Sequence, residues 1–350
     1  MKKARWKSRM LGIVILGAFL NVSITLSGNL WAASGDKPVE MSFALHIPPK
    51  TTAYTKALLP WTKEITNQTD GRVTFKFYLS QTLVKVRDAY NAVKTGVADL
   101  TWVAFSMTPG RFPLMSVLEL PYMSPDTYIG SHVLNDLFHK FPEIKAEVDD
   151  VHLLSLWVSL PYEIHTIKPV RTPEDIKGMK LATLPGARAV LEAMGAVPVP
   201  MAGPKIYQAV EKGVADGAVI AWGAYNAYRL YEVTKYHTNP HLAGLPYCVI
   251  MNKSKWNSLS KKDQDIINKV TNDMMPDLLC RAVTATMSIA VETSKKRGHE
   301  IIDLPPDELS KWRETGKPTW EEWAKQMEAK GFPGQKVLDE AVKLVEKYSK

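Results

Sequence analysis

Two ten-residue stretches of this sequence match each other and decide the fold. Tyr90-Asn-Ala-Val-Lys-Thr-Gly96-Val-Ala-Asp99 returns, more than a hundred residues later, as Tyr207-Gln-Ala-Val-Glu-Lys-Gly213-Val-Ala-Asp216. Each stretch predicts a helix that ends at a glycine and leads into a strand. Solenoid repeats recur every few tens of residues, whereas this unit recurs once. We therefore predict two similar α/β lobes; independent convergence on a common helix–glycine–strand unit is the alternative.

Strand and helix signals alternate before the first copy. Apolar residues alternate at 41–45 and 73–77, and helical spacing covers 53–65. A strand-like run at 99–103 follows the helix that Gly96 ends. This β-α-β-α-β order predicts a largely parallel sheet covered by helices, and ligands of such sheets bind beyond the carboxyl ends of the strands.

The second half repeats this alternation and then becomes helical. Strands are predicted at 151–158 and 179–183, and a helix at 187–194. Ser260 and Asp263 form a capping-box start for some 35 residues of helix, on the order of 50 Å long. A helix of that length can run across both lobes.

The first residues predict a secretory signal peptide. A basic start at 2–9 precedes the apolar run 11–20 and the small residues Ala32 and Ala33. A retained membrane anchor is the alternative, but polar residues interrupt the apolar stretch, and a spanning helix needs about 20 mostly apolar residues. We expect a mature protein that is exported through the inner membrane of a Gram-negative-type bacterium into the periplasm.

The formal charge of +8 does not indicate a nucleic-acid partner. Five of the positive charges lie in the predicted signal peptide, which contains no acid, so the mature chain carries +3. No basic stripe with interleaved aromatic residues follows. Cys248 and Cys280 are the only cysteines; an oxidising periplasm would permit a disulfide, and two separate buried thiols is the favoured interpretation.

The length of the chain also favours two lobes. A mature chain of about 317 residues exceeds what one hydrophobic core usually supports. We assign residues 1–33 to the signal peptide and residues 34–160 plus about 248–287 to the first lobe. The second lobe then comprises 161–247 plus about 288–350, and ends in two amphipathic helices.

Several short motifs carry a family resemblance that covers essentially the whole mature chain. They include Val170-Arg-Thr-Pro-Glu-Asp175-Ile-Lys-Gly178-Met-Lys180, Gly195-Ala-Val-Pro-Val-Pro-Met201, Thr108-Pro-Gly-Arg-Phe-Pro113, Glu119-Leu-Pro121 and Tyr231-Glu-Val-Thr-Lys-Tyr236. In order and spacing they resemble the solute-binding proteins of tripartite ATP-independent periplasmic (TRAP) transporters. The resemblance implies a two-lobed flytrap with a ligand cleft, crossing strands and a long helix spanning both lobes. It also implies a permease partner with a small and a large membrane subunit, driven by an ion gradient.

The sequence departs from the family pattern where a ligand carboxylate is expected to bind. The pattern places an arginine that pairs with the carboxylate where this chain has Ala182. The polar residues expected after Asp216-Gly217 are replaced by the apolar run 218–222. Without a bidentate guanidinium, a plain dicarboxylate is disfavoured. We expect a small organic acid with an aromatic or apolar portion, such as an aryl carboxylate; a neutral or zwitterionic solute is the alternative.

Five aromatic side chains are candidates for the ligand site. Phe105 and Trp222 each follow a strand in the two matching units, so facing rings could stack on a ligand. Trp102 and Trp157 lie within predicted strands, where core packing is the competing role. Tyr162 follows Pro161 near the presumed first crossing between the lobes, so a hinge role competes with a ligand role.

Three arginines and one histidine are the remaining candidates. Arg188 begins a helix, whose N-terminal amides would also favour an anion, and Arg111 and Arg87 lie near predicted cleft ends. We expect at least one of the three to face the cleft. A solvated or structural role competes for each of them. His46 follows the first strand, at the edge where the ligand is expected.

Enzyme motifs are missing from the sequence. It contains no Gly-x-Ser-x-Gly elbow, no His-Glu-x-x-His and no phosphate-binding glycine loop, and the eight histidines show no metal-ligand spacing. We expect a monomeric or weakly dimeric binding protein that is not an enzyme and needs no cofactor or metal. A ligand-sensing module for a membrane receptor would share the same fold and is a further alternative.

Overall fold

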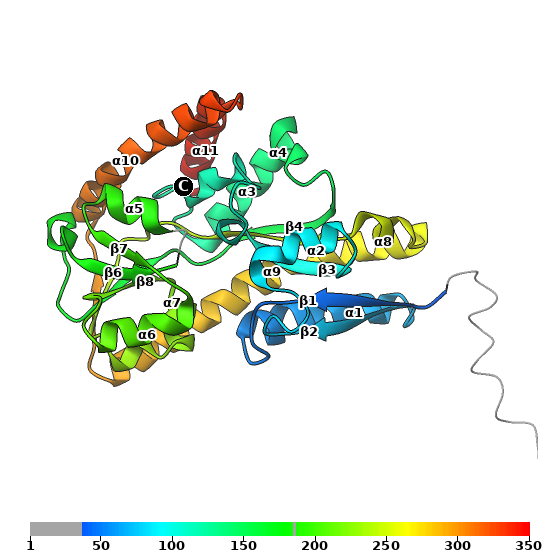
Figure 1. The fold of residues 1–350 in the computed structure, drawn as a ribbon, viewed down its shortest axis with the longest axis horizontal. Helices are drawn as coiled ribbons and strands as arrows, with labels where there is room; N and C mark the ends of the chain where they lie inside the picture. Colours follow the sequence, from blue (N-terminus) through cyan, green and yellow to red (C-terminus); the bar gives the residue numbers. More distant parts are fainter. Residues whose placement is uncertain (1–36, 185–186) are drawn as a thin grey trace, which may run out of the picture. The chain divides into compact units, whose positions relative to one another are not determined.

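Two mixed β-sheets organise the chain, one in each predicted lobe (Figure 1). The computed structural model describes residues 37–184 and 187–350, so the predicted signal peptide lies outside the described residues. The chain from Pro38 to Lys350 forms one compact unit. The first sheet has the order β2-β1-β3-β10-β4, with the strands β1 (Val39–Ala44), β2 (Val73–Tyr78), β3 (Leu100–Ala104), β4 (His152–Val158) and β10 (Pro246–Met251).

The second sheet has six strands and pairs in a similar way. Its order is β11-β9-β5-β8-β6-β7, with β5 (Glu163–Thr166), β6 (Lys180–Thr183), β7 (Val197–Pro200), β8 (Gly217–Ile220), β9 (Tyr236–Asn239) and β11 (Glu300–Asp303). β6 runs parallel to β7 and β8, whereas β5 is antiparallel to β8 and β9. In the first sheet β10 is the antiparallel strand, between β3 and β4.

Helices cover both faces of each sheet. On the first sheet, α1 (Leu59–Gln68) and α8 (Lys253–Asn257) pack on one face, and α2 (Ala89–Lys94), α3 (Thr127–Lys140) and α4 (Pro142–Ala146) on the other. On the second, α5 (Arg188–Ala193) lies opposite α6 (Gly203–Glu211) and α7 (Trp222–Ala227). Both lobes therefore have the layered α/β architecture that the alternating pattern predicts.

The two matching sequence units have the same backbone geometry. α2 stops at Gly96 and α6 at Gly213, each in the left-handed region with φ of +80° and +67°. In both copies the residue after the glycine donates its N–H to a carbonyl five residues earlier, from Val97 to Ala92 and from Val214 to Ala209. The strand that follows runs parallel to β1 in one lobe and to β6 in the other. The helix–glycine–strand unit predicted for each lobe is confirmed.

Two crossing segments join the lobes and pair with each other. Residues 159–162 lead from β4 to β5, and residues 240–245 lead from β9 back to β10. Tyr162 donates its N–H to the Ala243 carbonyl at 2.9 Å, and Leu242 donates its N–H to the Tyr162 carbonyl at 3.1 Å. The connection is thus a two-stranded hinge.

The predicted long helix is present and contacts both lobes. α9 (Lys261–Lys296) spans 36 residues, begins where Ser260 Oγ accepts the Asp263 N–H, and contains Pro276. It packs against α1 and β4 of the first lobe and against α7 and β11 of the second (Figure 1). By length and composition α9 could cross a membrane, but those contacts make it the helix that ties the lobes together.

The C-terminal boundary differs from the predicted one. The sequence assigns residues 288–350 to the second lobe, but α11 (Gly334–Tyr348) packs on α3 of the first lobe. Its apolar stripe, which includes Leu338 and Leu344, completes the core there. α10 (Pro306–Ala329) bridges the lobes, with Trp312 in the core of the second and Trp323 in the core of the first. An amphipathic stripe shows that a helix packs, but not which lobe receives it.

Candidate ligand-binding site

Three aromatic rings gather on one face of the first sheet, near the hinge. Tyr247 of β10 pairs in register with Trp157 of β4, and Trp102 of β3 lies opposite Val249, two residues along β10. Because alternate residues share a face, the three side chains meet. Their ring centroids are 4.9 to 5.2 Å apart. We call Trp102, Trp157 and Tyr247 the aromatic cluster.

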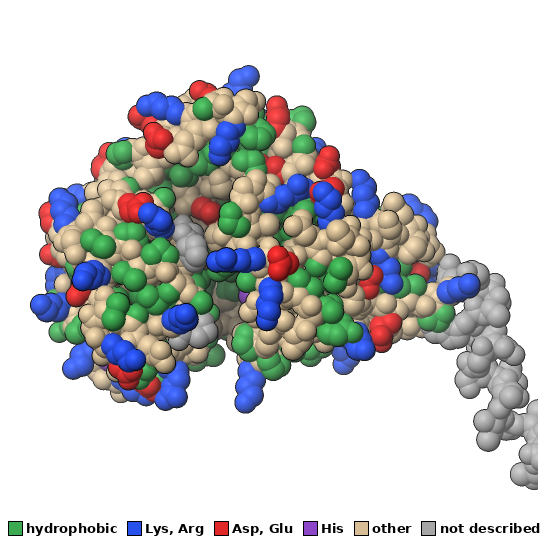
Figure 2. All heavy atoms as spheres, in the orientation of Figure 1, with side chains coloured by type: hydrophobic (Ala, Val, Ile, Leu, Met, Phe, Trp, Pro, Cys, Tyr) green, Lys and Arg blue, Asp and Glu red, His purple; other side chains and the backbone are tan. Residues whose placement is uncertain are grey.

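Trp102 and Trp157 belong to the hydrophobic core of the first lobe, and Tyr247 lies where that core meets the core of the second lobe. Figure 2 shows the surface hollowed along the line between the two lobes, with Lys and Arg side chains around the opening. The sequence motifs do not single out Tyr247; its only signal is its place in a short apolar strand.

Tyr162 and Glu119 extend the cluster across the hinge. Burial raises the pKa of Tyr162 well above its usual range, and the neighbouring Tyr247 and Glu119 add to the rise. Burial also raises the pKa of Glu119 to about 8, opposed by the Ser106 backbone N–H. Glu119 ends a short helical turn, Met115–Glu119, and is an isolated acid in an apolar stretch, which is the sequence signal that would have found it.

Several buried polar atoms here have no partner. Among the described residues, the indole nitrogens of Trp102 and Trp157, the hydroxyl of Tyr162 and Oε1 of Glu119 make no hydrogen bond. Trp102 is 4% exposed, and Trp157 and Tyr162 are each 3% exposed. Buried polar groups are partnered in the large majority of cases. The unpartnered groups beside the aromatic cluster make it a candidate ligand site.

His46 adds a neutral ring to the same region. It follows β1 and lies against Trp102, with ring centroids 5.9 Å apart. Burial lowers the pKa of His46 to about 4, so the imidazole is uncharged at neutral pH. His46 therefore contributes a polar surface but no positive charge.

Phe105 and Trp222 lie in the lobe cores rather than in the aromatic cluster. Phe105 stacks on Phe112 with centroids 4.1 Å apart, within the first lobe. Trp222 is 1% exposed, and its indole N–H donates to Asn239 Oδ1 at 3.1 Å. The two residues do occupy equivalent places after β3 and β8, but both have all their partners inside their own lobe. This geometry favours the packing role that competed with the ligand role.

The three candidate arginines also lie apart from the cluster. Arg111 pairs with Asp150 at 2.6 Å and stacks over the Tyr90 ring. Arg188 is exposed and pairs with Glu192, one turn along α5. Arg87 is exposed on a short helical turn. Within the described part of the chain, no hydrogen bond, ion pair or ring contact joins these arginines to Trp102, Trp157 or Tyr162.

Cations among the described residues do not contribute to the pKa shifts at the cluster. No Lys or Arg is among the groups that shift the pKa of Glu119, Tyr162 or Tyr247 in the described part of the chain. Glu163, which begins β5, is buried but is paired with His241 at 2.7 Å. The bond to Glu163 raises the pKa of His241, although burial acts in the opposite direction. The charges of Glu163 and His241 therefore balance each other.

Ala182, where the family pattern places an arginine, is surrounded by apolar side chains. Ala182 is fully buried in the second lobe, in the same core cluster as Ala218 and Ile220. The run 218–222 thus forms strand and core on that side.

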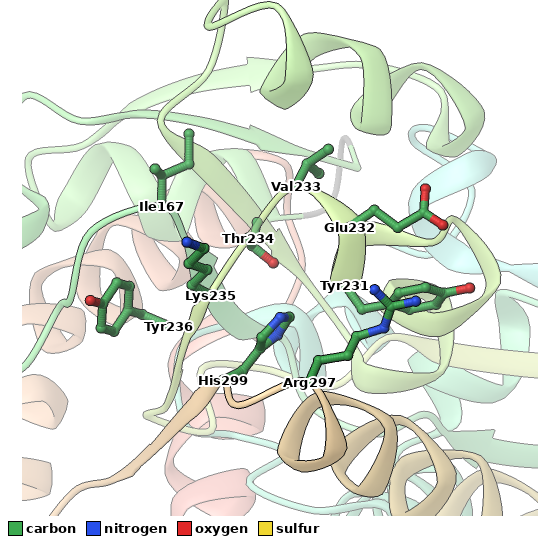
Figure 3. Close-up of a pocket in the computed structure, with 9 residues that line it drawn as sticks. All are labelled: Ile167, Tyr231, Glu232, Val233, Thr234, Lys235, Tyr236, Arg297 and His299. Carbon is green, nitrogen blue, oxygen red and sulfur yellow. The ribbon is translucent and has the colours of Figure 1, made fainter.

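A separate surface pocket lies on the second lobe, beside the end of β5 and the start of β9. It has a volume of about 460 Å³ and is lined by residues that include Ile167, Lys235 and His299 (Figure 3). Arg297 stacks over the ring of Tyr231 there. None of its lining residues carries one of the unpartnered buried atoms found in the described part of the chain. The aromatic cluster is therefore the better candidate site.

No group of three His, Cys, Asp or Glu side chains that could hold a metal occurs among the described residues. The two cysteines are separate: Cys248 is buried in β10 and Cys280 is half-buried on α9, and neither forms a disulfide.

Comparisons with known proteins agree with this architecture. Residues 43–326 match the family described as bacterial extracellular solute-binding protein, family 7. A solute-binding protein of Chromohalobacter salexigens is 28% identical over 278 residues, covering 78% of this chain and 79% of the relative.

Two solved structures are similar over almost the whole chain. One is a TRAP solute-binding protein of an unidentified marine microbe, specific for aromatic acid ligands and crystallised with 3-hydroxybenzoate. It is 27% identical to this chain, with a TM-score of 0.81, and the match covers 90% of this chain and 100% of that one. The other, from Rhodoferax ferrireducens, contains copurified benzoate; it is 26% identical with a TM-score of 0.80, covering 89% and 98%.

Proposed function

This chain belongs to bacterial extracellular solute-binding protein family 7, and from that premise we propose that it captures a small organic acid with an aromatic or apolar portion. The receptor acts in the periplasm and delivers the acid to an ion-gradient-driven TRAP permease with a small and a large membrane subunit. The family is a class of transport receptors, and the described chain provides the two lobes and the hinge that capture requires.

The aromatic cluster is the observation that carries this proposal. Trp102, Trp157 and Tyr247 offer flat apolar faces against which an aromatic ring can pack. Small-molecule sites are mostly apolar with a few well-placed polar groups, and the unpartnered donors beside the cluster fit that description. Similar proteins that bind 3-hydroxybenzoate and benzoate support an aryl acid as the ligand class.

Closure of the lobes is the expected response to the ligand. The paired crossing segments at 159–162 and 240–245 can bend together, while α9 remains attached to both lobes. The mature protein is expected to be a monomer or weak dimer. A neutral or zwitterionic ligand, or a sensing role beside a membrane receptor, would use the same closure.

A thermal-shift screen of the purified mature protein tests the proposal. The panel contains benzoate, 3-hydroxybenzoate and mandelate, with succinate, malate and glucose as controls. A hundredfold excess over the dissociation constant stabilises by about 2.7 kcal/mol, which is readily seen as a raised melting temperature. Small-angle scattering should then show a smaller radius of gyration with the stabilising acid. Stabilisation by succinate or malate alone would contradict the proposal.

A further inference from the structure

We propose that the ligand carboxylate is held without any cation, by the indole N–H groups of Trp102 and Trp157, the hydroxyl of Tyr162 and the protonated carboxyl of Glu119. These four residues are named the neutral donor set. The inference rests on the proposed function, because it describes how that same site binds its acid.

The chemistry of the unpartnered atoms determines which kind of ligand group they need. An indole nitrogen can only donate a hydrogen bond, so the two tryptophans require an acceptor. A carboxylate has two oxygens with about four acceptor positions. It can therefore satisfy both indoles, the Tyr162 hydroxyl and one further donor.

Glu119 is the fourth member because of its surroundings. It is largely buried, no Lys or Arg neutralises it, and its Oε1 has no partner. Tyr162 from the hinge and Tyr247 from β10 face it. α3 and α11 also pack on its helical turn but contribute no charge that shifts its pKa. The carboxyl is thus protonated at neutral pH and can donate to a ligand oxygen.

A second anion beside Glu119 strengthens this state. Two carboxylates that share a buried site cannot both ionise without a large penalty, so one retains its proton. Binding of the acid should therefore hold the proton on Glu119. As the pH rises through the pKa of Glu119, about 8 in the free protein, the binding-competent form is lost.

An organic cation is the competing ligand for an aromatic cluster with a nearby carboxyl group. A quaternary ammonium group packs well on aromatic faces. It has no acceptor atom, however, and would leave both indole N–H groups buried without partners. The neutral donor set therefore favours an anion.

Calorimetric titrations of 3-hydroxybenzoate test the donors. Trp102→Phe and Trp157→Phe each remove an indole N–H and retain a ring, and each should weaken binding about tenfold or more, as loss of a hydrogen bond to a charged group does. Trp256→Phe is the matched control, since Trp256 stacks on His152 outside the cluster; its affinity should equal that of the unaltered protein. Equal affinity in all three variants would overturn the proposal.

A pH series tests Glu119. Between pH 8.5 and 10 the dissociation constant of the unaltered protein should rise about tenfold per pH unit, whereas Glu119→Gln, which donates at every pH, should bind with little change. An affinity that rises with pH, or preferential binding of phenyltrimethylammonium, would overturn the inference. If no aryl acid binds at any pH, the proposed function fails as well; if the acid binds with an unaltered pH profile in Glu119→Gln, only the inference fails.

Discussion

Tyr247 stacks on Trp157 across two neighbouring strands, with ring centroids 4.9 Å apart and planes inclined by 14°. The pair arises because β10 returns from the second lobe and inserts antiparallel between β3 and β4. The segment that returns through the hinge thus places the Tyr247 ring against the Trp157 ring. The lobe connection and the proposed ligand surface share this segment of chain.

Truncation of Trp222 should lower folding stability and leave ligand affinity unchanged. Trp222→Ala removes a fully buried side chain from the core of the second lobe and should cost about 3–5 kcal/mol of folding stability. Urea unfolding measures this cost. The affinity of the folded fraction for an aryl acid should remain unchanged, and a weakened affinity at unaltered stability would return Trp222 to the ligand site.

Gly96 and Gly213 should tolerate alanine equally. Both have a left-handed backbone, and an added Cβ meets nothing closer than 3.7 Å at Gly96 and nothing within 4 Å at Gly213. Gly96→Ala and Gly213→Ala should each cost about 1 kcal/mol, from the backbone alone.

Gly217→Ala is the comparison for this pair in the same urea experiment. Its Cβ would lie 2.4 Å from the His165 carbonyl oxygen, so the neighbouring strand β5 must move and the cost should be clearly larger. Equal losses in all three variants would contradict the equivalence of the two helix stops.

Acid should destabilise the second lobe through its buried histidines. His165 and His237 are joined by a 3.0 Å hydrogen bond, and burial lowers their pKa to about 3 and about 2. Both are neutral in the folded chain but protonate near pH 6.5 when unfolded, so their contribution is full above pH 6.5 and is lost as the pH falls below it. Each should cost about 1.4 kcal/mol per pH unit.

Urea unfolding between pH 5 and 8 measures this dependence. Below pH 6.5, His165→Asn should reduce the slope of unfolding free energy against pH by about 1.4 kcal/mol per pH unit, which corresponds to one proton. His139→Asn, on the first lobe, is the control, because the His139 side chain is exposed. An unchanged slope in His165→Asn would show that the buried histidines do not govern acid stability.

Much of the fold could be predicted because its signals are local. The glycine stops, the alternating strands and the capping pair of Ser260 and Asp263 all act within a few residues, and the structure has them where expected. The position of β10 could not be predicted, since its partners lie about a hundred residues or more away in sequence. The prediction that α11 belongs to the second lobe was wrong for the same reason, because its partner α3 is also distant in sequence.

The candidate site was only partly accessible to sequence reasoning. Trp102 and Trp157 were candidates within predicted strands, with core packing as the competing role, and Tyr162 was a candidate near the hinge. The structure brings the two tryptophans into ring contact and places Tyr162 beside Tyr247 of the same cluster. Tyr247 depends on a long-range strand pairing and was missed. Arg111 stood near a predicted cleft end, but its partner Asp150 is 39 residues away. A pattern gives the position of a side chain along a strand, but not which distant group binds it.

The most direct test of the account is a crystal structure of the mature protein with the acid that stabilises it most. The ligand ring should lie against Tyr247 and its carboxylate within hydrogen-bond distance of Trp102 Nε1 and Trp157 Nε1, with no arginine or lysine in contact. A ligand bound beside Trp222, or a carboxylate paired with a guanidinium, would contradict it.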